Sequence, residues 1–429
     1  MSILGQAMKS KIVLSITEGR VIRDLFENGF LDMLTARNLE LACFTPAERI
    51  PEFIERWSKP GITFHALKPY EMEARLARSL KIRNIFIKKI PSFLPFWDKV
   101  AQKMLHPDME LIEKIRGARL AVITHPMFHT EFPVLRAALE LNIPTLGVLR
   151  SWDNLHKGLR LIPDTLAVWN EVNGEEAVRM MGYRPQQVKI IGGAQFDPYF
   201  AHDTTWTREQ FALHYQLDAS RPVIIIATLG AFLHLYDETY LVDWLLHEID
   251  NGNIPNSPQV VIRLHPSSKL ENFQKYLSHP DVRISSIDGY IPSLGWTMSR
   301  NDVIAVANLL RHADLVISPG STITIESAIF DTPTIVPLFH TYQPELGKRQ
   351  FDFHLSNHFK RLRELDLVPF VSTPEELLLA VRCAIADKSL YRMQRAQLVR
   401  DYIHFTDGNS TERLVELMEG LCHAPATPA

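Results

Sequence analysis

The stretch ADLVISPGSTITIESAIFDTPTIVPL, residues 313–338, contains two short apolar runs separated by a segment with helical spacing. The first run predicts a strand over 315–318, and Pro319-Gly320 predicts a turn after it. Ser321-Thr322 is a pair that favours the start of a helix. The second run predicts another strand over 334–337. A strand, a helix and a second strand in this order indicate a βαβ unit of a parallel sheet.

The same alternation of β-branched runs and helical segments extends along the whole chain in two series. In the first series the expected strands span 11–16, 39–44, 62–66, 120–124, 145–149, 165–169 and 188–191. In the second series they span 223–228, 259–264, 282–284, 315–318, 334–337 and 368–371. The predicted fold class is therefore α/β, with two Rossmann-like, doubly wound domains that face each other across a cleft.

The length of the chain indicates more than one domain. A chain of 429 residues is too long for a single hydrophobic core, and two domains are the simplest division. The turn-rich stretch GGAQFDPYFAHDTT, residues 192–205, separates the two series of strands. We expect one domain over residues 1–197, a second over residues 198–422, and a tail over residues 423–429.

The composition excludes several classes of protein. Hydrophobic residues make up 46% of the chain and charged residues 22%, as in folded globular proteins, and a net charge of -3 gives no overall attraction to nucleic acid. Cys43, Cys383 and Cys422 are widely separated and predict neither a disulfide framework nor a zinc site. The first residues lack the order of a signal peptide, and no apolar run is long enough to span a membrane. We therefore expect a cytoplasmic protein.

The 313–338 stretch also has the chemistry of a phosphate-binding loop. Ligands of parallel sheets bind at the carboxyl ends of strands, and Gly320 lets the backbone approach a ligand closely. The N–H groups where Ser321 and Thr322 open the helix can face a phosphate, and Glu326 is placed to reach a ribose hydroxyl pair. The alternative is an ordinary helix cap with Glu326 on a solvated face.

A second candidate site is QVVIRLHPSSK, residues 259–269, where Arg263, His265 and Lys269 follow a strand and Pro266 fixes the exit of the chain. A histidine there can donate to a phosphate oxygen, and the two cations can neutralise the charge of a leaving phosphate. The alternative is a histidine capped by backbone groups at a strand end.

Two strand ends in the first half carry groups that can move protons. The segment AVITHPMFHTEFPVL places His125 at a strand end and His129 one helical turn later. Two histidines at this spacing can bind a metal, but no third ligand accompanies them, so we expect no metal. The segment SITEGR places Glu18 after the first strand, where a carboxylate can act as a general base. Helix capping by His125 and a helix-start charge at Glu18 are the alternatives.

Several segments resemble, in order and spacing, GT-B glycosyltransferase-like proteins of bacterial surface-polysaccharide synthesis. The resemblance covers nearly the whole chain and is weakest over residues 48–108. It includes the CDP-glycerol glycerophosphotransferases and the Kdo and sialic acid transferases. The segments that carry it are SWDNLHKGLRLIPDTLAVWNEVNGEEAVRMMGY (151–183), KIIGGAQFD (189–197), RLHP (263–266), SPGSTITIESAIFDTPTIV (318–336) and FTDGNSTERLVELM (405–418).

The resemblance implies that the C-terminal domain binds a nucleotide-activated donor and that the N-terminal domain binds an acceptor. It further implies that the SWDN segment binds a sugar through Asp153 and Asn154, with an ordinary Asx turn as the alternative. The last helix is expected to run back toward the first domain. In several of those groups a His-Pro pair and a Ser/Thr-rich helix start contact the donor phosphates, and the matching positions are His265, Pro266, Ser318, Ser321 and Thr322.

The predicted function is transfer of a sugar, or a related unit, from a nucleotide-activated donor to a hydroxyl of a polysaccharide or lipid-linked acceptor, with no cofactor and no metal. Glu18, Asp153 and His125 are the candidate bases, in that order, and Gly19 and Asn154 are the expected acceptor contacts. The alternatives are a nucleotide-sugar 2-epimerase of the same architecture and a non-catalytic nucleotide-sugar-binding protein.

Residues 75–103 form a basic segment in a slightly acidic chain. Basic residues interleaved with large apolar ones suit an anionic membrane surface, which predicts peripheral contact with the inner face of the plasma membrane. The alternative is a solvated helix pair whose aromatic residues enter the core, and no nucleic-acid motif accompanies the charge. The basic residues are Arg75, Arg78, Lys81, Arg83, Lys88, Lys89, Lys99 and Lys103, and the aromatic residues are Phe86, Phe93, Phe96 and Trp97.

Overall fold

A computed structural model gives the fold. It describes residues 10–68, 70, 74–87, 96, 97, 100, 104, 106–159, 162–201, 204–229, 238–287, 289–348, 352 and 358–424. The chain divides into two compact units. The first consists of Met1–Asp197, Tyr290–Met298 and Phe405–Ala429, and the second of Pro198–Gly289 and Ser299–His404.

The first unit is built on a seven-stranded sheet in which all neighbouring strands are parallel. Its strands are β1 (Lys11–Ser15), β2 (Glu40–Thr45), β3 (Ile62–Ala66), β4 (Leu120–Ile123), β5 (Thr145–Val148), β6 (Thr165–Val168) and β7 (Val188–Ile190). Their order is β3-β2-β1-β4-β5-β6-β7. The chain thus moves outward from β1 in one direction and then, from β4, in the other, as in a doubly wound fold.

Helices cover both faces of this sheet, because the strands are apolar on both faces. The helices of the first unit are α1 (Gly19–Asp24), α2 (Phe30–Ala36), α3 (Pro51–Trp57), α4 (Ala74–Ile87), α6 (Met109–Ile115), α7 (Phe132–Glu140), α8 (Asn154–Lys157), α9 (Glu171–Met181) and α18 (Ser410–His423). Ile12 and Leu14 of β1 pack with α1, α2, α3 and α18, whereas Val13 packs with α4, α6 and α7. All three side chains are fully buried.

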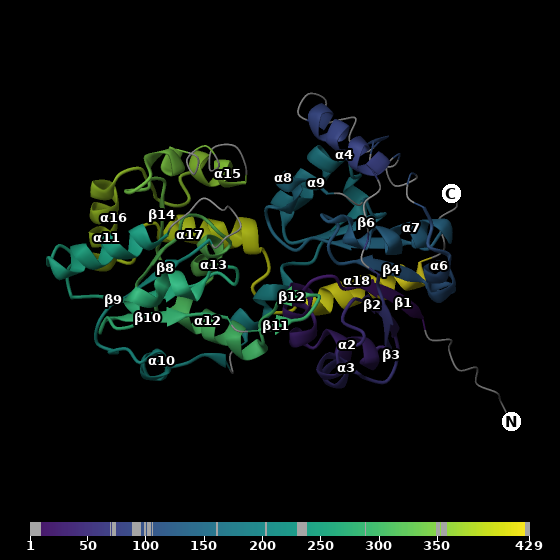
Figure 1. Cartoon of the computed structure of the whole chain (residues 1–429), viewed down its shortest axis with the longest axis horizontal. Helices are drawn as coiled ribbons and strands as arrows, with labels where there is room; N and C mark the ends of the chain where they lie inside the picture. Colours follow the sequence, from purple (N-terminus) through teal and green to yellow (C-terminus); the bar gives the residue numbers. More distant parts are fainter. Residues whose placement is uncertain are drawn as a thin grey trace. The chain divides into compact units, whose positions relative to one another are not determined.

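Two segments from the second half of the sequence complete the first unit. One is an antiparallel hairpin formed by β11 (Tyr290–Ile291) and β12 (Gly295–Trp296). The other is α18, drawn in yellow in Figure 1, whose buried Leu414 and Met418 join the core around α2. The Asp197 carboxylate accepts the first N–H groups of this helix, from Ser410 at 3.0 Å and from Thr411 at 2.8 Å.

The second unit is built on a six-stranded parallel sheet in the order β10-β9-β8-β13-β14-β15. Its strands are β8 (Val223–Ala227), β9 (Gln259–Arg263), β10 (Val282–Ser285), β13 (Leu315–Ile317), β14 (Thr334–Pro337) and β15 (Phe370–Val371). Its helices are α10 (Arg208–Tyr215), α11 (Thr239–Asp250), α12 (Arg300–His312), α13 (Ile323–Ile329), α15 (Phe359–Glu364), α16 (Pro374–Ala386) and α17 (Arg392–Leu398).

The predicted fold class is confirmed, because both units are Rossmann-like α/β domains with parallel sheets. Every predicted strand is present, with its ends displaced by at most two residues. The hairpin of β11 and β12 is an addition that the sequence did not predict. Residues 425–429 of the predicted tail lie outside the described residues.

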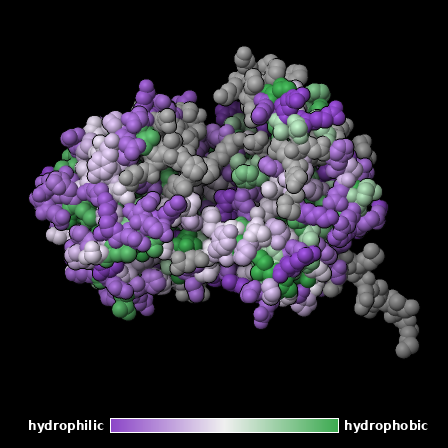
Figure 2. Space-filling model, in the orientation of Figure 1, coloured by the Kyte–Doolittle hydropathy of each residue, from purple (hydrophilic) through white to green (hydrophobic). Residues whose placement is uncertain are grey.

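The described surface is mostly hydrophilic. On the face shown in Figure 2, hydrophobic residues form small patches among hydrophilic ones. Among the described residues, no helix has both the length and the apolar character needed to cross a membrane.

The part of the basic segment that the structure describes is divided between surface and interior. On α4, Arg75, Arg78 and Lys81 are exposed, whereas Arg83 is buried and donates to the carbonyl of Leu159 at 2.6 Å. The two aromatic side chains also differ in exposure. Phe96 is 62% exposed, whereas Trp97 is partly buried and its indole N–H donates to Ser79. Outside the described residues or side chains lie Phe86, Lys88, Lys89, Phe93, Lys99 and Lys103.

Candidate functional site

The first candidate site lies where two adjacent strands of the first unit end. Glu18 follows β1, and His125 follows β4. Because the carboxyl ends of parallel strands meet at one edge of a sheet, the two side chains are brought together. Nδ1 of His125 lies 2.9 Å from Oε1 of Glu18. The structure therefore joins two of the three side chains that the sequence proposes as the base.

Two arginines hold the other oxygen of the Glu18 carboxylate. Arg20 donates to Oε2 from Nε at 2.9 Å and from Nη2 at 2.5 Å, and Nη1 of Arg150 lies 3.4 Å from the same atom. Arg150 is buried and also donates to Asp24, with 2.9 Å between Nη2 and Oδ2. Charge-assisted hydrogen bonds of this kind fix the carboxylate in one orientation.

These contacts decide which member of the Glu18 and His125 pair can accept a proton. Burial alone would raise the pKa of Glu18, but the contact with His125 and the charges of Arg20 and Arg150 outweigh it and hold that pKa well below its usual range. Burial lowers the pKa of His125 to about 4, although the Glu18 carboxylate acts in the opposite direction. At neutral pH the pair is an ionised carboxylate and a neutral imidazole. The geometry therefore favours His125 as the base, whereas the sequence placed Glu18 first.

Glu131, which the sequence did not single out, ties the ends of β1 and β4 together. Its buried carboxylate accepts hydrogen bonds from the hydroxyl groups of Ser15 at 2.5 Å, Thr17 at 3.1 Å and Thr124 at 2.9 Å. The backbone N–H of His125 donates to it at 3.2 Å. Burial raises the pKa of Glu131 to about 7 despite these donors. Glu131 thus fixes the backbone of the His125 loop against β1.

The start of α1 is covered by the hairpin of β11 and β12. The N–H of Gly19 donates to the carbonyl of Leu294 at 2.8 Å. A Cβ atom on Gly19 would lie 2.5 Å from the carbonyl oxygen of Trp296, so this contact requires glycine. The Trp296 ring stacks under Arg20 and Arg23, with 5.8 and 5.5 Å between guanidinium carbon and ring centroid. The sequence assigned Gly19 to the acceptor, but its N–H is bonded within the protein.

The SWDN segment forms the loop between β5 and α8. Oδ1 of Asn154 accepts the N–H groups of two residues that precede it, Arg150 at 3.1 Å and Ser151 at 3.0 Å. Asp153 precedes the helix and accepts from Nδ2 of Asn154 at 3.3 Å. Both side chains are buried. The amide of Asn154 therefore holds the loop that carries Arg150, although not through the Asx turn of the alternative interpretation.

The two candidate histidines, His125 and His129, have different surroundings. The ring of His129 packs against Tyr70 and Phe132, with centroid distances of 5.9 and 6.2 Å, whereas His125 packs against Phe128 at 4.3 Å. The part of the chain that the structure describes contains no group of three His, Cys, Asp or Glu side chains placed to hold a metal.

The second candidate site lies at the carboxyl ends of three adjacent strands of the second unit. His265 follows β9, Thr228 follows β8, and Ser318 follows β13. His265 and Ser318 are two strands apart, which corresponds to about 10 Å at the usual spacing of strands. Two loops at this separation can hold successive phosphates of one ligand.

The ring of His265 is oriented by neighbouring polar groups. Its Nδ1 accepts the N–H of Ser267 at 3.1 Å and lies 2.7 Å from the hydroxyl oxygen of that residue. Its backbone N–H donates to Oγ1 of Thr228 at 2.8 Å. Because Nδ1 is an acceptor, the neutral ring carries its proton on Nε2. His265 therefore supplies an N–H donor of the kind that suits a phosphate oxygen.

The loop between β13 and α13 keeps its backbone close to buried hydroxyl groups. Oγ of Ser318 is buried, accepts the N–H of Gly320 at 3.4 Å and lies 3.4 Å from Oγ of Ser321. Gly320 has a φ of 107°, which side chains of L-residues disfavour. Thr322 is the residue before α13, but its side chain does not cap the helix. The predicted cap by Ser321 or Thr322 is thus replaced by a turn built around Ser318.

Arg263 and Glu326 interact with other groups of the second unit. Nη1 of Arg263 donates to Oγ of Ser285 at 2.9 Å, and burial lowers the pKa of this guanidinium, although the charge of Glu326 and the phenol of Tyr199 act in the opposite direction. The hydroxyl of Tyr199 lies 3.4 Å from Oε2 of Glu326, so Glu326 is held by a neighbour. Lys269 is exposed at the end of its loop. The predicted cations beside His265 therefore do not form one hydrogen-bonded cluster.

Comparison with known proteins supports the fold. No family model and no curated protein sequence matches the chain. It is similar to the UDP-GlcNAc 2-epimerase from Neisseria meningitidis bound to UDP-GlcNAc, with 15% identity and a TM-score of 0.58 over 96% of this chain and 100% of that chain. The UDP-GlcNAc 2-epimerase from Methanocaldococcus jannaschii gives 16% identity and a TM-score of 0.53 over 96% and 100% of the two chains.

A third similar structure is the wall teichoic acid polymerase TagF, with 11% identity and a TM-score of 0.55 over 96% of this chain and 88% of that chain. At these identities the likeness shows a shared fold. The comparisons therefore support the architecture of two Rossmann-like domains.

Proposed function

We propose that the protein is a GT-B-type glycosyltransferase, which transfers a sugar or a related unit from a nucleotide-activated donor to a hydroxyl of a polysaccharide or lipid-linked acceptor. The observation that supports this most is the Glu18 and His125 pair, a neutral imidazole held by an ionised carboxylate at a strand-end edge. Such a pair is suited to removing the proton of a hydroxyl group as that group attacks.

In sugar transfer, the acceptor oxygen bonds to the anomeric carbon of the donor while the bond from that carbon to the phosphate oxygen breaks. The acceptor proton passes to His125, and the Glu18 carboxylate stabilises the resulting imidazolium. The bonding electrons leave with the nucleotide phosphate. The N–H of His265 and the backbone N–H groups of Ser321 and Thr322 then stabilise the charge on that phosphate.

This proposal gives each half of the chain a role. The first unit forms the acceptor side and the second unit the donor side. The boundaries expected from the sequence, 1–197 and 198–422, differ from these units because Tyr290–Met298 and Phe405–Ala429 belong to the first unit. Because hydrogen bonds act on the leaving phosphate, the scheme uses no metal and no resident cofactor.

A nucleotide-sugar 2-epimerase is the second candidate, favoured by the two similar structures that carry that name. An epimerase also requires groups that remove and return a proton, which the Glu18 and His125 pair could supply. The two activities differ in their substrates, because epimerisation requires no acceptor.

The deciding experiment has two stages. A thermal-shift screen with CMP, CDP, UDP, GDP and dTDP identifies the nucleotide, because a ligand that binds the native state raises the apparent Tm. The matching donors, and UDP-N-acetylglucosamine in any case, are then incubated with the protein alone and with candidate acceptors. Nucleotide release that depends on the acceptor supports the transferase. Conversion of the donor to its epimer without an acceptor contradicts it, and so does binding of a donor that no tested acceptor consumes.

We further propose that the exposed basic face of α4 binds an anionic membrane surface. Arg75, Arg78 and Lys81 are exposed there, and Ile82 is 38% exposed beside them. Basic groups next to apolar ones are attracted by anionic lipid head groups and can anchor at the interface. Such docking would place a cytoplasmic enzyme beside lipid-linked acceptors.

The protein is expected to sediment with anionic vesicles at low salt and to be released as salt screens the charges. The variant with Arg75, Arg78 and Lys81 replaced by Glu is expected to remain in the supernatant. A matched control replaces three exposed basic residues elsewhere in the first unit, Arg179, Arg184 and Lys189, by Glu. Membrane docking through α4 is refuted if both variants sediment equally.

A further inference from the structure

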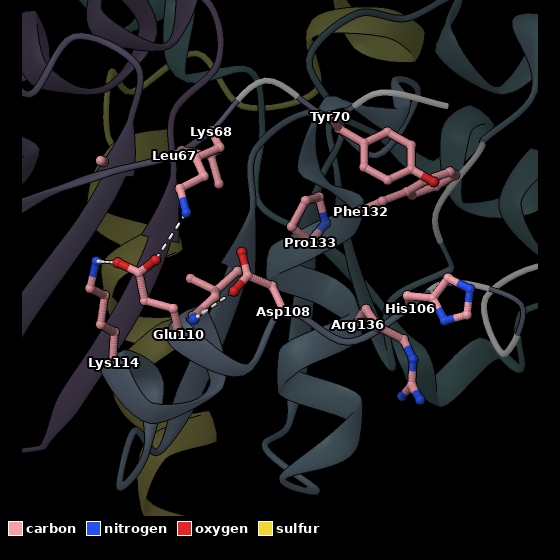
Figure 3. A pocket seen from close by; sticks show the side chains of 12 residues that line it. Leu67, Lys68, Tyr70, His106, Asp108, Glu110, Lys114, Phe132, Pro133 and Arg136 are labelled. Carbon is pink, nitrogen blue, oxygen red and sulfur yellow. Dashed lines mark hydrogen bonds and ion pairs between the residues drawn. The ribbon is translucent and has the colours of Figure 1, made fainter. Parts of the chain in front are cut away.

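A cavity of about 260 Å³ lies at the end of β3, between α6 and α7 of the first unit. Figure 3 shows the side chains that line it. A volume of this size is below the usual range for pockets that hold drug-sized molecules and suits a single sugar unit better than a nucleotide. None of the predicted donor-binding or catalytic residues lines it.

One wall of the cavity carries two ammonium groups held by one carboxylate. Glu110 accepts from Nζ of Lys68 at 2.9 Å and from Nζ of Lys114 at 2.7 Å (Figure 3). The hydrogen bonds from Lys114 and Lys68 lower the pKa of Glu110 to about 2, so Glu110 stays ionised. An ammonium group has three N–H donors, and these two are fixed in place by Glu110 while their side chains remain 71% and 37% exposed. They are therefore positioned to donate to a bound anion.

The opposite side of the cavity is aromatic. The ring of Tyr70 packs edge-on against Phe132, with 5.4 Å between centroids, and Pro133 lies between these rings and the lysine wall (Figure 3). Apolar ring faces pack against the C–H surface of a sugar, while charged groups bond to its polar substituents. The cavity thus combines the two kinds of contact that a charged sugar makes.

The lysine wall carries a surplus of positive charge. Lys68 and Lys114 share the single carboxylate of Glu110, whereas Arg136 is paired with Glu140, with 2.5 Å between Nη1 and Oε2. Asp108 accepts the N–H of Leu111 at 3.1 Å at the start of α6, so part of its charge is directed to the helix. A ligand with one negative group therefore fits better than a neutral one.

The cavity is joined to the first candidate site by a short, rigid connection. Glu131 bonds to the backbone N–H of His125, and the next residue, Phe132, begins α7 and lines the cavity. The loop between His125 and Phe132 also carries His129, whose ring centroid lies 5.9 Å from that of Tyr70. A ligand bound in the cavity would therefore lie on the same strand-end side of the first unit as His125.

We propose that this cavity binds an acidic sugar unit of the glycan acceptor, with its anionic group on Lys68 and Lys114 and its ring against Tyr70 and Pro133, which are partly exposed while Phe132 is buried behind them. The identification of the ligand as part of the acceptor rests on the proposed function, but binding of an acidic sugar to the cavity can be tested without it. Carboxylate and phosphate are the two chemical sources of the negative charge, and the probes below distinguish them.

Calorimetric titration compares three probes of the same length: a tetrasaccharide containing glucuronic acid, a tetrasaccharide carrying a phosphate ester and a neutral glucose tetrasaccharide. At least one anionic probe is expected to bind more tightly than the neutral one, and its affinity is expected to fall with salt. The probe that binds more tightly identifies carboxylate or phosphate as the anionic group.

In the double variant Lys68→Gln and Lys114→Gln, the Kd of the anionic probe is expected to rise about tenfold, or about threefold for each partly exposed ion pair. Both side chains lie at the surface, so the variant should fold. The double variant Arg184→Gln and Lys189→Gln is the control, because it also removes two positive charges, from exposed positions on and just before β7 at the other edge of the sheet, and it should leave the Kd unchanged. Tyr70→Leu should weaken binding of the sugar probe while keeping an apolar side chain.

The inference is overturned if no anionic probe binds, if the neutral probe binds equally well, or if the lysine variant binds as tightly as the control. Its failure is distinguishable from failure of the proposed function, because the nucleotide screen tests the second unit. A protein that binds and turns over a donor but binds no acidic probe would retain the proposed function without this site.

Discussion

Transfer by the His125→Gln protein is expected to be about a thousandfold slower than by the unmodified protein, because glutamine cannot accept a proton at neutral pH. Glutamine is polar and of similar size, which suits a position that is only 3% exposed. His156→Gln is the matched control, since His156 forms another histidine–carboxylate pair in the first unit, 2.8 Å from Glu176. The measured quantity is kcat at saturating donor and acceptor, with circular dichroism to verify folding.

The pH profile of kcat/KM tests the same assignment. A base is active when unprotonated, and because the pKa of His125 is lowered to about 4, kcat/KM should change little from about pH 8 to about pH 5 and fall near pH 4. Glu18→Gln removes the charge that favours the imidazolium, so the fall should move to lower pH and the rate should decrease by on the order of a hundredfold. Full activity of a folded His125→Gln protein, or a midpoint near the ordinary histidine value of 6.5, would contradict the role of His125.

The strands could be predicted because central parallel strands are buried on both faces and form continuous apolar runs, such as VIIIA at 223–227. The hairpin of β11 and β12 could not be predicted in this way. Its strands have two residues each, too few for a periodic pattern. It is held by Gly19, far away in the sequence, through a close backbone approach that only the folded chain reveals.

The sequence could predict those site residues that directly follow a strand, because ligands of parallel sheets bind at the carboxyl ends of strands. Glu18 and His125 both follow predicted strands, and the pairing of β1 with β4 brings them together. Arg150 also follows a strand, but its partner Asp24 lies within α1, and no sequence spacing connects the two. The order of preference between Glu18 and His125 depends on burial and on the two arginines, which a pattern of residue types does not contain.

The donor loop shows the same limit in another form. The sequence located the turn at Pro319-Gly320, and in the structure Gly320 has a φ of 107°, a value that favours glycine. It also predicted a helix cap from the presence of Ser321 and Thr322. The structure instead places the buried hydroxyl of Ser318 at the centre of the turn. Residue type indicated that hydroxyl groups gather there, but the backbone path determined which of them makes the bond.

His265→Ala is expected to lower kcat by about a hundredfold, equivalent to about 3 kcal/mol, because it removes the N–H donor assigned to the leaving phosphate. Ser321→Ala is expected to weaken donor binding by about 1 kcal/mol, or roughly fivefold in Kd, through loss of one hydrogen bond. The side chain of Ser321 caps no helix, so its replacement should leave α13 intact. Replacement of His265 should thus lower mainly kcat, and replacement of Ser321 should weaken mainly the binding of the donor.

The double variant separates a shared ligand from two structural roles. If both residues contact the same phosphates, the loss in kcat/KM should differ from the sum of the two single losses, whereas independent roles give additive losses. His279→Ala is the control, since His279 also accepts a backbone N–H two residues later, from Asp281 at 3.2 Å, but lies before β10. Its donor binding and turnover should be unchanged. Additive losses, or full activity of a folded His265→Ala protein, would leave His265 as a strand-end residue whose ring serves only its own loop.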